Sequence, residues 1–299
     1  MDMLTVANLK KRFGDKEVLK GVSLSVPEKS VFGFIGKNGA GKTTTMKAVL
    51  GLMEVDEGEI YVAGERVTYG QTKTNRYIGY LPDVPEFYNF MTAYEYLEFC
   101  GEMAGMKKEE IKERCVEMLK LVGLSDEKHR IKGFSRGMKQ RLGIAQALLG
   151  RPKLLICDEP TSALDPVGRK EILDILMAVK EETTVVFSTH ILSDVERICT
   201  DVAFLNNGKI IMQGKMDEIK EKNKSEDMVL EFETEEAAKK VLDAFSECSA
   251  TEGTNLIFKG TNDRMFEMLK FIAENKINIY KVERMERTLE SLFLEVVEG

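Results

Sequence analysis

The chain has 299 residues, enough for about two domains of ordinary size. Its 43% hydrophobic and 31% charged content is typical of a globular protein in water, and its net charge of −7 argues against non-specific nucleic-acid binding as its main role. No apolar run is long enough for a membrane-spanning helix, and we expect no signal peptide. Five scattered cysteines without CxxC spacing favour reduced, buried thiols in a cytosol.

The first half of the chain changes from strands to helices. Short runs rich in branched residues predict strands over residues 4–9, 17–26, 30–35, 59–63 and 78–81. Apolar residues spaced three and four apart predict helices over residues 94–103, 109–122 and 135–149.

Strands and helices alternate after residue 150. The patterns predict strands over 153–157 and 183–187, helices over 167–180 and 191–198, and a hairpin over 201–213. An Asn-Gly pair in the hairpin favours a tight turn. This alternation favours an α/β fold in which helices cover both faces of a parallel sheet.

The last part of the chain has a different pattern. Residues 220–227 are highly charged and predict a linker. Beyond them, the patterns predict strands over 228–232, 255–259 and 277–282 and helices over 235–245, 263–275 and 288–297. We therefore expect a small accessory α+β domain over residues 228–299, and its order suggests a ferredoxin-like module.

Residues 36–43 read G-K-N-G-A-G-K-T and fit the phosphate-binding pattern G-x-x-x-x-G-K-[ST]. A strand-like run precedes them, and a predicted helix over 44–50 follows, with Gly51 at its expected C-terminal cap. This order directs backbone N–H groups at phosphate. Lys42 is expected to reach the β- and γ-phosphates, and Thr43 to ligate Mg²⁺. The remaining phosphate-loop contacts are expected from Gly36, Asn38, Gly39, Ala40, Gly41 and Thr44.

A second apolar strand ends in two carboxylates, Asp158 and Glu159. Asp158 can hold Mg²⁺ beside Thr43, directly or through water. Glu159 then points at the γ-phosphate, where it can accept a proton from the attacking water or orient it. Alone, the pattern equally suits a strand followed by solvated acids. The phosphate loop favours the functional interpretation.

Residues 134–141, F-S-R-G-M-K-Q-R, resemble the signature sequence of ATP-binding cassette (ABC) proteins. The resemblance continues through S-A-L-D, which ends at Asp165 and is similar to the D-loop, and S-T-H, which ends at the switch histidine His190. Phe13 lies where the family places an aromatic ring that stacks on adenine, although Phe13 also suits an ordinary core position. The resemblance covers roughly residues 1–216 and implies a P-loop ABC cassette over 1–219, with a β-rich subdomain and a helical subdomain at about 85–150.

This resemblance implies an ATP-binding and hydrolysing subunit of an ABC transporter, with ATP and Mg²⁺ as cofactors. The resemblance implies that Glu159, His190 and Lys42 are the catalytic residues. In the family, each ATP lies between the phosphate loop of one protomer and the signature of another, so a homodimer is expected. Ser135 and Gly137 would then face a γ-phosphate, and Asp165 would bridge the protomers. Ser135 also suits a simple helix N-cap, and the two roles are compatible.

The resemblance also implies a separately encoded membrane permease as partner and no nucleic acid. The chain would be cytoplasmic and peripheral on the inner face of the cell membrane. The aromatic segment 85–97 corresponds to the family's groove for a cytoplasmic helix of the permease, although part of it must be core. The signature and the C-terminal appendage resemble bacterial ABC-2-type exporters.

Three positions in two motifs depart from the family pattern. Asp83 stands where glutamine is usual, and this shorter anion can still contact Mg²⁺ or a water. In the signature, Arg136 replaces a glycine and Met138 a glutamine. The sequence leaves three interpretations of Arg136 open: it pairs with phosphate, it pairs with acids across the dimer, or it is a solvated charge.

Two rival functions are considered. A soluble ABC ATPase acting on ribosomes or DNA is disfavoured by the single phosphate loop, the absence of a long coiled-coil insertion and the acidic charge. A cassette that binds ATP as a switch without hydrolysing it is disfavoured by Glu159 and His190.

Overall fold

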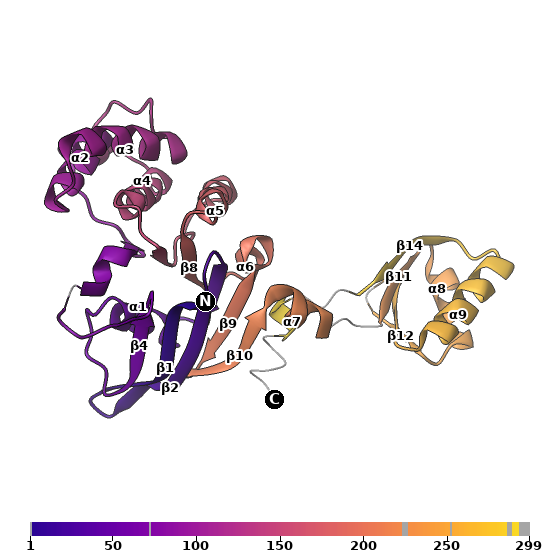
Figure 1. Cartoon of the computed structure of the whole chain (residues 1–299). Coiled ribbons are helices and arrows are strands. Elements are labelled where there is room, and N and C mark those ends of the chain that lie inside the picture. The colour runs from indigo at the N-terminus through magenta and orange to yellow at the C-terminus, as the bar shows by residue number, and fades with distance from the viewer. Residues whose placement is uncertain (1, 72, 223–226, 252, 286–288, 293–299) are drawn as a thin grey trace. The chain divides into compact units, whose positions relative to one another are not determined.

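Three β-sheets organise the described part of the chain (Figure 1). The computed structural model describes residues 2–71, 73–222, 227–251, 253–285 and 289–292. The chain divides into two compact units, Met1–Asp217 and Glu218–Gly299, which we call the cassette and the C-terminal domain.

The boundary between the units falls inside a helix that the sequence did not predict, α7 (Met216–Lys222). Met216 and Ile219 lie one turn apart and are both buried, although the residues around them are charged. The predicted linker over 220–227 therefore begins as helix, which is a correction, and residues 223–226 lie outside the described residues.

The central sheet of the cassette has the strand order β10-β9-β3-β8-β7-β6. Neighbouring strands are parallel except for the antiparallel β9–β10 pair, so the predicted parallel sheet is confirmed. The strands are β3 (Val31–Ile35), β6 (Ile78–Leu81), β7 (Leu154–Asp158), β8 (Thr184–Thr189), β9 (Asp201–Asn206) and β10 (Lys209–Lys215). Asn207 and Gly208 both have positive φ and form the tight turn that the Asn-Gly pair predicted.

A second, antiparallel sheet has the order β2-β1-β4-β5. Its strands are β1 (Asp2–Phe13), β2 (Lys16–Pro27), β4 (Glu57–Val62) and β5 (Glu65–Arg66). β1 and β2 are longer than predicted because their exposed, charged ends obscure the apolar alternation. One buried core joins this sheet, the central sheet and α1 (Lys42–Val49), with Leu4, Leu24, Phe32, Met46 and Ile156 among its members.

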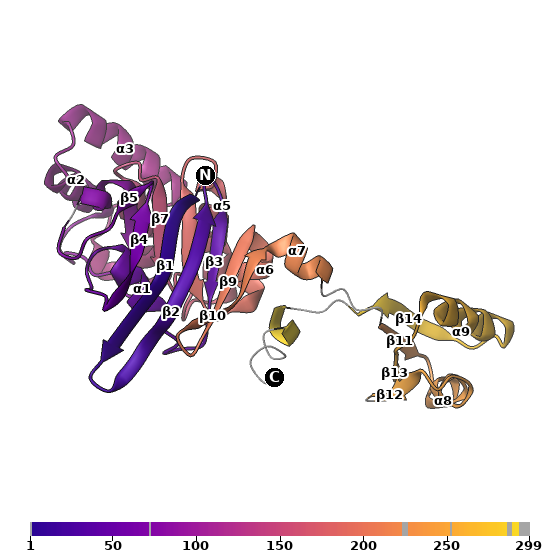
Figure 2. The ribbon, with the colours of Figure 1, turned by 60° about the horizontal axis from the view of Figure 1, so that its bottom comes forward.

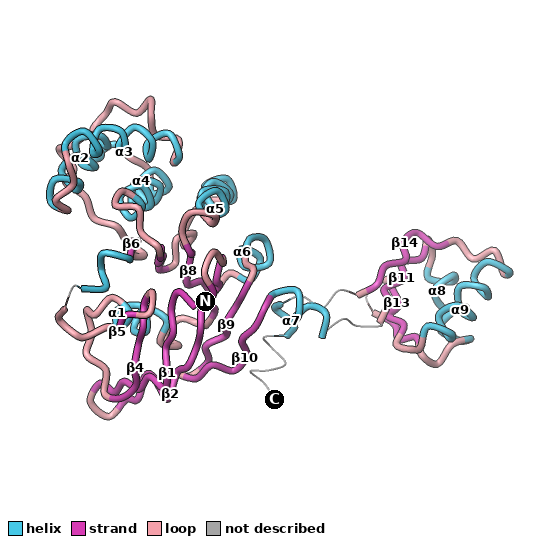
Figure 3. The backbone as a smooth tube through the Cα atoms, viewed as in Figure 1, coloured by secondary structure: helices cyan, strands magenta, loops and turns pink. Residues whose placement is uncertain are grey.

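Three helices form the predicted helical group, and the third of them packs against β6 (Figure 3). They are α2 (Ala93–Met103), α3 (Lys108–Leu121) and α4 (Arg136–Leu148). α2 begins with a capping box, in which Thr92 accepts from the Glu95 N–H and its own N–H donates to Glu95. The other helical segments of the cassette are α5 (Pro166–Val179), α6 (Leu192–Ile198), η1 (Lys73–Tyr77) and η2 (Ile131–Gly133).

The C-terminal domain follows the β-α-β-β-α-β order of ferredoxin-like domains. Its elements are β11 (Met228–Phe232), α8 (Glu235–Ala244), β12 (Cys248–Ala250), β13 (Asn255–Phe258), α9 (Asn262–Glu274) and β14 (Ile279–Arg284). The antiparallel sheet has the order β12-β13-β11-β14, and both helices lie on one face (Figure 2). The three-residue β12 was not predicted because it is too short to show a pattern. Of the predicted helix over 288–297, residues 289–292 are helical and the rest lie outside the described residues.

Candidate functional site

The predicted phosphate loop connects the fully buried β3 to α1. Gly41 precedes the helix with a φ of 114°, and a Cβ there would lie 2.7 Å from Leu19 Cδ2. A Cβ on Gly36 would lie 2.6 Å from the carbonyl oxygen of Leu205. Both positions therefore require glycine, which leaves the backbone open for an anion.

Helix α1 begins two residues earlier than predicted, at Lys42, and ends one residue earlier, at Val49. Gly51 has a φ of 67°, and its N–H donates to the Ala48 carbonyl at 3.0 Å. The Leu52 N–H donates to the Lys47 carbonyl at 2.9 Å. These two bonds form a Schellman motif and confirm the glycine cap.

Three predicted catalytic residues lie in one chain of contacts. Lys42 is 6% exposed, and its Nζ donates to the Gly36 carbonyl at 2.6 Å and lies 3.0 Å from Glu159 Oε1. Glu159 Oε2 lies 2.9 Å from His190 Nδ1. Because a buried charge needs a partner, Glu159 and Lys42 hold each other in place at the loop.

Ser188 joins the Asp158 carboxylate to the Glu159 backbone, a role that was not predicted. Its hydroxyl donates to Asp158 Oδ1 at 2.6 Å and accepts from the Glu159 N–H at 2.9 Å. β7 and β8 pair in parallel with Asp158 opposite Ser188, which explains the contact. Glu159 has a φ of 49°, in the left-handed region that non-glycine residues rarely adopt. Ser188 begins the S-T-H motif that ends at the switch histidine, and this motif was the sequence signal from which its role could have been predicted.

A cleft of about 480 Å³ brings nine of the predicted site residues together from distant parts of the chain, and Asp158 is not among the residues that line it. Its lining comprises Lys16, Val18, Asn38, Gly39, Gly41, Lys42, Thr43, Thr44, Asp83, Glu159, Ser162 and His190. Lys16, Val18 and Ser162 were not predicted as site residues; Ser162 begins the S-A-L-D motif, whereas no motif included Lys16 or Val18. Phe13 ends β1 outside this lining and is 48% exposed, so its alternative interpretation as a core residue is wrong. Its adenine contact stays a prediction.

Asp83 lies in the cleft beside other charges. Burial raises the pKa of its carboxyl, the nearby Arg136 guanidinium lowers it, and the negative charges of Asp158 and Glu159 raise it further. Arg136 Nη2 lies 3.7 Å from Asp83 Oδ1. Arg136 therefore faces an acid of its own chain, a partner that the sequence did not predict.

The predicted contacts to a second protomer lie outside the cleft lining of this chain. Ser135 is the N-cap of α4, and its hydroxyl accepts from the Met138 N–H at 3.2 Å. Gly137 lies in the first turn of the same helix. Asp165 is the N-cap of α5, and its Oδ1 accepts from the Gly168 N–H at 2.8 Å. The capping role of Ser135 is confirmed, while the roles across a dimer stay predictions.

Comparison with known proteins decides the family. The ABC transporter family model matches residues 19–162. The ABC transporter ATP-binding protein YxlF of Bacillus subtilis is 38% identical over 305 residues, which cover 99% of each chain. The chain belongs to the ABC transporter ATP-binding proteins. The bacitracin transport ATP-binding protein BcrA of Bacillus licheniformis is 33% identical over 99% of this chain and 98% of its own.

Solved structures agree with this assignment. The crystal structure of the ADP conformation of MJ1267, an ATP-binding cassette of an ABC transporter, is similar with a TM-score of 0.66. It is 26% identical and covers 73% of this chain and 92% of its own. The predicted P-loop ABC cassette is therefore confirmed, and the match favours a transporter subunit over an ATPase of ribosomes or DNA.

The residues of this ABC ATP-binding protein suit Mg²⁺, the metal expected with ATP. Thr43, Asp158 and Asp83 offer hydroxyl and carboxylate oxygens, which are the ligands that Mg²⁺ prefers. Among the described residues, no cluster of three or more His, Cys, Asp or Glu side chains could hold a metal. Nucleotide phosphates would therefore have to complete the ligand set, as is usual for Mg²⁺.

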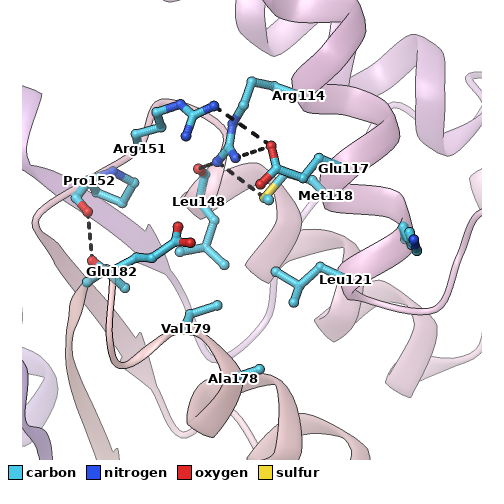
Figure 4. A pocket seen from close by; sticks show the side chains of 12 residues that line it. Arg114, Glu117, Met118, Leu121, Leu148, Arg151, Pro152, Ala178, Val179 and Glu182 are labelled. Atoms are coloured by element: carbon cyan, nitrogen blue, oxygen red, sulfur yellow. Dashed lines mark hydrogen bonds and ion pairs between the residues drawn. The ribbon is translucent and has the colours of Figure 1, made fainter.

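A larger cavity, of about 580 Å³, contains none of the predicted site residues (Figure 4). Its wall includes Arg114, which is 3% exposed and donates to the carbonyls of Leu148 at 2.6 Å and Leu149 at 3.2 Å. Arg114 Nη1 also lies 2.6 Å from Glu117 Oε2. The buried guanidinium thus satisfies the carbonyls that end α4, which is a structural role.

Proposed function

We propose that this ABC ATP-binding protein hydrolyses ATP·Mg²⁺ as a dimer and drives a separate membrane permease that exports its substrate. The observation that carries the proposal is the chain of contacts from Lys42 through Glu159 to His190 inside the phosphate-loop cleft. In this chain of contacts, Lys42 is the cation that binds phosphate and Glu159 is the carboxylate that activates water. His190 holds that carboxylate in place.

Hydrolysis follows from how the two oxygens of Glu159 are engaged. Oε1 faces Lys42 and Oε2 faces His190. A phosphate that draws Lys42 away leaves Oε1 available to accept a proton from the attacking water, while His190 keeps the carboxylate oriented. Lys42 and the loop N–H groups then stabilise the negative charge that develops on the phosphate. Bound Mg²⁺, held by Thr43 and Asp158 with Asp83 nearby, would supply further charge stabilisation.

Dimer formation is supported by the location of the signature residues. Ser135 and Gly137 begin α4 outside their own chain's cleft, yet a helix N-terminus with free N–H groups suits an anion. A second copy would bring this helix start to the γ-phosphate and complete the site. Nucleotide binding would then close the dimer, and hydrolysis would open it.

An aromatic surface on the helical subdomain suits the permease. Tyr88 and Phe90 are 50% and 64% exposed, and their ring centroids lie 5.9 Å apart. Tyr88 packs edge-on against Phe99, with ring centroids 5.6 Å apart, so the surface is partly ordered by its own aromatic contacts. Exposed apolar side chains of this kind suit an amphipathic helix.

A membrane partner also agrees with the relatives. No helix among the described residues has the length and apolar character needed to cross a bilayer. BcrA is named for bacitracin transport, which supports a role in moving a substrate across a membrane. We propose that the chain lies on the cytoplasmic face of the membrane and is held there by the permease.

Glu159→Gln tests hydrolysis directly. The variant should lose ATP turnover and retain ATP, giving a stable dimer by gel filtration, because the amide cannot accept the proton. Glu182→Gln, which removes an acid outside the cleft, is the control and should behave like the parent. Turnover by Glu159→Gln at the parental rate would show that the base is assigned wrongly.

Phe90→Ser tests the permease surface. It should weaken co-purification with the permease and leave the ATPase rate of the isolated chain unchanged. Val116→Ser, which replaces a 62% exposed apolar residue on α3, is the control. Equal co-purification of both variants and the parent would exclude this surface as the docking site.

A further inference from the structure

Two of the departures from the ABC pattern, Asp83 and Arg136, contact each other. Asp83 follows β6, and Arg136 is the first residue of α4, more than fifty residues further along the chain. Arg136 Nη2 lies 3.7 Å from Asp83 Oδ1. The side chain of Gln140, one turn later on α4 and 1% exposed, donates to the Asp83 carbonyl at 3.0 Å. Two residues of one helix therefore hold the same aspartate.

The Asp83 carboxylate lies where negative charge accumulates. It lines the cleft together with Lys42 and Glu159. Its Oδ1 is buried and accepts no hydrogen bond from the described residues, so the nearby Arg136 is the charge that faces it. A nucleotide in the cleft would add several negative charges beside this carboxylate and beside Glu159. The repulsion would weaken nucleotide binding unless a cation offsets it.

We propose that Arg136 is a positioning residue that acts within its own chain, where it offsets the charge of Asp83 so that the cleft accepts an anionic nucleotide. This inference rests on nucleotide binding in the cleft, as proposed above. These two departures are then one compensated pair. Loss of Arg136 alone leaves the negative charge of Asp83 uncompensated beside the nucleotide phosphates. Loss of both charged side chains leaves this part of the cleft neutral.

The pair predicts a specific dependence between two substitutions. Each side chain is 48% exposed, and partly exposed ion pairs contribute modestly, so Arg136→Gln should weaken ADP binding about two- to fivefold. Asp83→Asn should tighten binding slightly, because it removes a negative charge. The double variant that combines Asp83→Asn with Arg136→Gln should bind ADP like Asp83→Asn alone, and Arg136→Lys should bind like the parent.

The experiment is isothermal titration of the full chain with ADP, with Mg²⁺ and again in EDTA, where Asp83 has no metal to contact. The protein is kept at a concentration where sedimentation shows a monomer, so that no signature from a second copy reaches the site. Lys139→Gln removes one charge from the same helix and is the matched control. It should change the affinity less than Arg136→Gln. Circular dichroism verifies that each variant is folded.

Three outcomes would overturn the inference. An equal loss of affinity from Arg136→Gln in the parent and in the Asp83→Asn variant would mean that Arg136 contacts the nucleotide itself. No loss in either background would mean that Arg136 is a solvated charge. An effect of Lys139→Gln equal to that of Arg136→Gln would mean that only overall charge matters. Failure of the parent chain to bind ADP is a distinct result, because it would overturn the proposed function of the cleft.

Discussion

The cassette and the C-terminal domain differ in what they bury. Every buried polar or charged side chain among the described residues lies in the cassette, including Lys42, Asp158 and Glu159. The described core of the C-terminal domain consists of apolar side chains and one cysteine, with Leu230 and Phe258 fully enclosed. Burying charge costs free energy unless each group has a partner, so a fold keeps such groups mainly where function requires them.

A second buried network in the cassette supports this view. Asp194, which is 3% exposed, accepts from the Thr161 hydroxyl at 2.7 Å and from Arg169 at 2.5 Å. Thr161 lies two residues after Glu159, and Asp194 lies four residues after His190. The network therefore connects the two segments that carry the proposed base and its histidine, and no comparable network lies in the described part of the C-terminal domain.

The largest effect tests the apolar side of this comparison. Phe258→Ala should destabilise the C-terminal domain by about 3 to 5 kcal/mol, because the fully buried ring leaves a cavity. ADP affinity of the cassette should be unchanged in titrations. Phe266→Ala, which removes a 63% exposed ring from α9, should unfold like the parent in urea. A large loss of nucleotide affinity in Phe258→Ala would show that the C-terminal domain contributes to nucleotide binding and would contradict this comparison.

The next effect tests the charged side. Lys42→Ala should lower ATP turnover about a hundred- to thousandfold, because the phosphates lose a directed cation and Glu159 loses its buried partner. Lys37→Ala removes the same charge from the exposed part of the loop and should cost far less. Steady-state ATPase rates measure both. Similar rates for the two variants would contradict the special role of the buried lysine.

A structural charge in the cassette should affect stability and not chemistry. Arg114→Met should lower the free energy of unfolding by about 2 to 3 kcal/mol, because it leaves the buried carbonyls of Leu148 and Leu149 without their donor. Arg151→Met, at 62% exposure on the same cavity, should change it by less than about 0.5 kcal/mol. Urea unfolding of the cassette measures both. Equal losses in the free energy of unfolding for the two variants would mean that the burial of the arginine does not determine its contribution to stability.

The smallest effects come from matched helix caps in the two units. Thr92 caps α2 in the cassette, and Thr234 caps α8 in the C-terminal domain. Thr92→Ala and Thr234→Ala should each cost about 1 kcal/mol, because each leaves a helix N–H without its acceptor. Hydrogen exchange should report the loss only in the unit that carries the change. Matching losses in both units would mean that the units unfold together.

Much of the fold was predictable because its signals are local. Helices α2 to α5 begin and end within about one or two residues of their predicted bounds, since caps and apolar spacing lie within the segments themselves. Elements with weak local signals were missed. The helix α7 looks like a charged linker until its two buried apolar residues are seen, and β12 has only three residues.

The sequence by itself determined the motifs of this ABC ATP-binding protein: the glycine loop with Lys42, the two carboxylates and the switch histidine. These motifs are runs of consecutive residues, and their backbone geometry is set by neighbours in the chain. Only the tertiary structure decided that Ser188 bonds both the Asp158 carboxylate and the Glu159 backbone N–H, and that Arg136 faces Asp83. Those pairs join residues about thirty and fifty positions apart, and contacts of that kind depend on strand order and on how α4 packs beside β6, which no local pattern encodes.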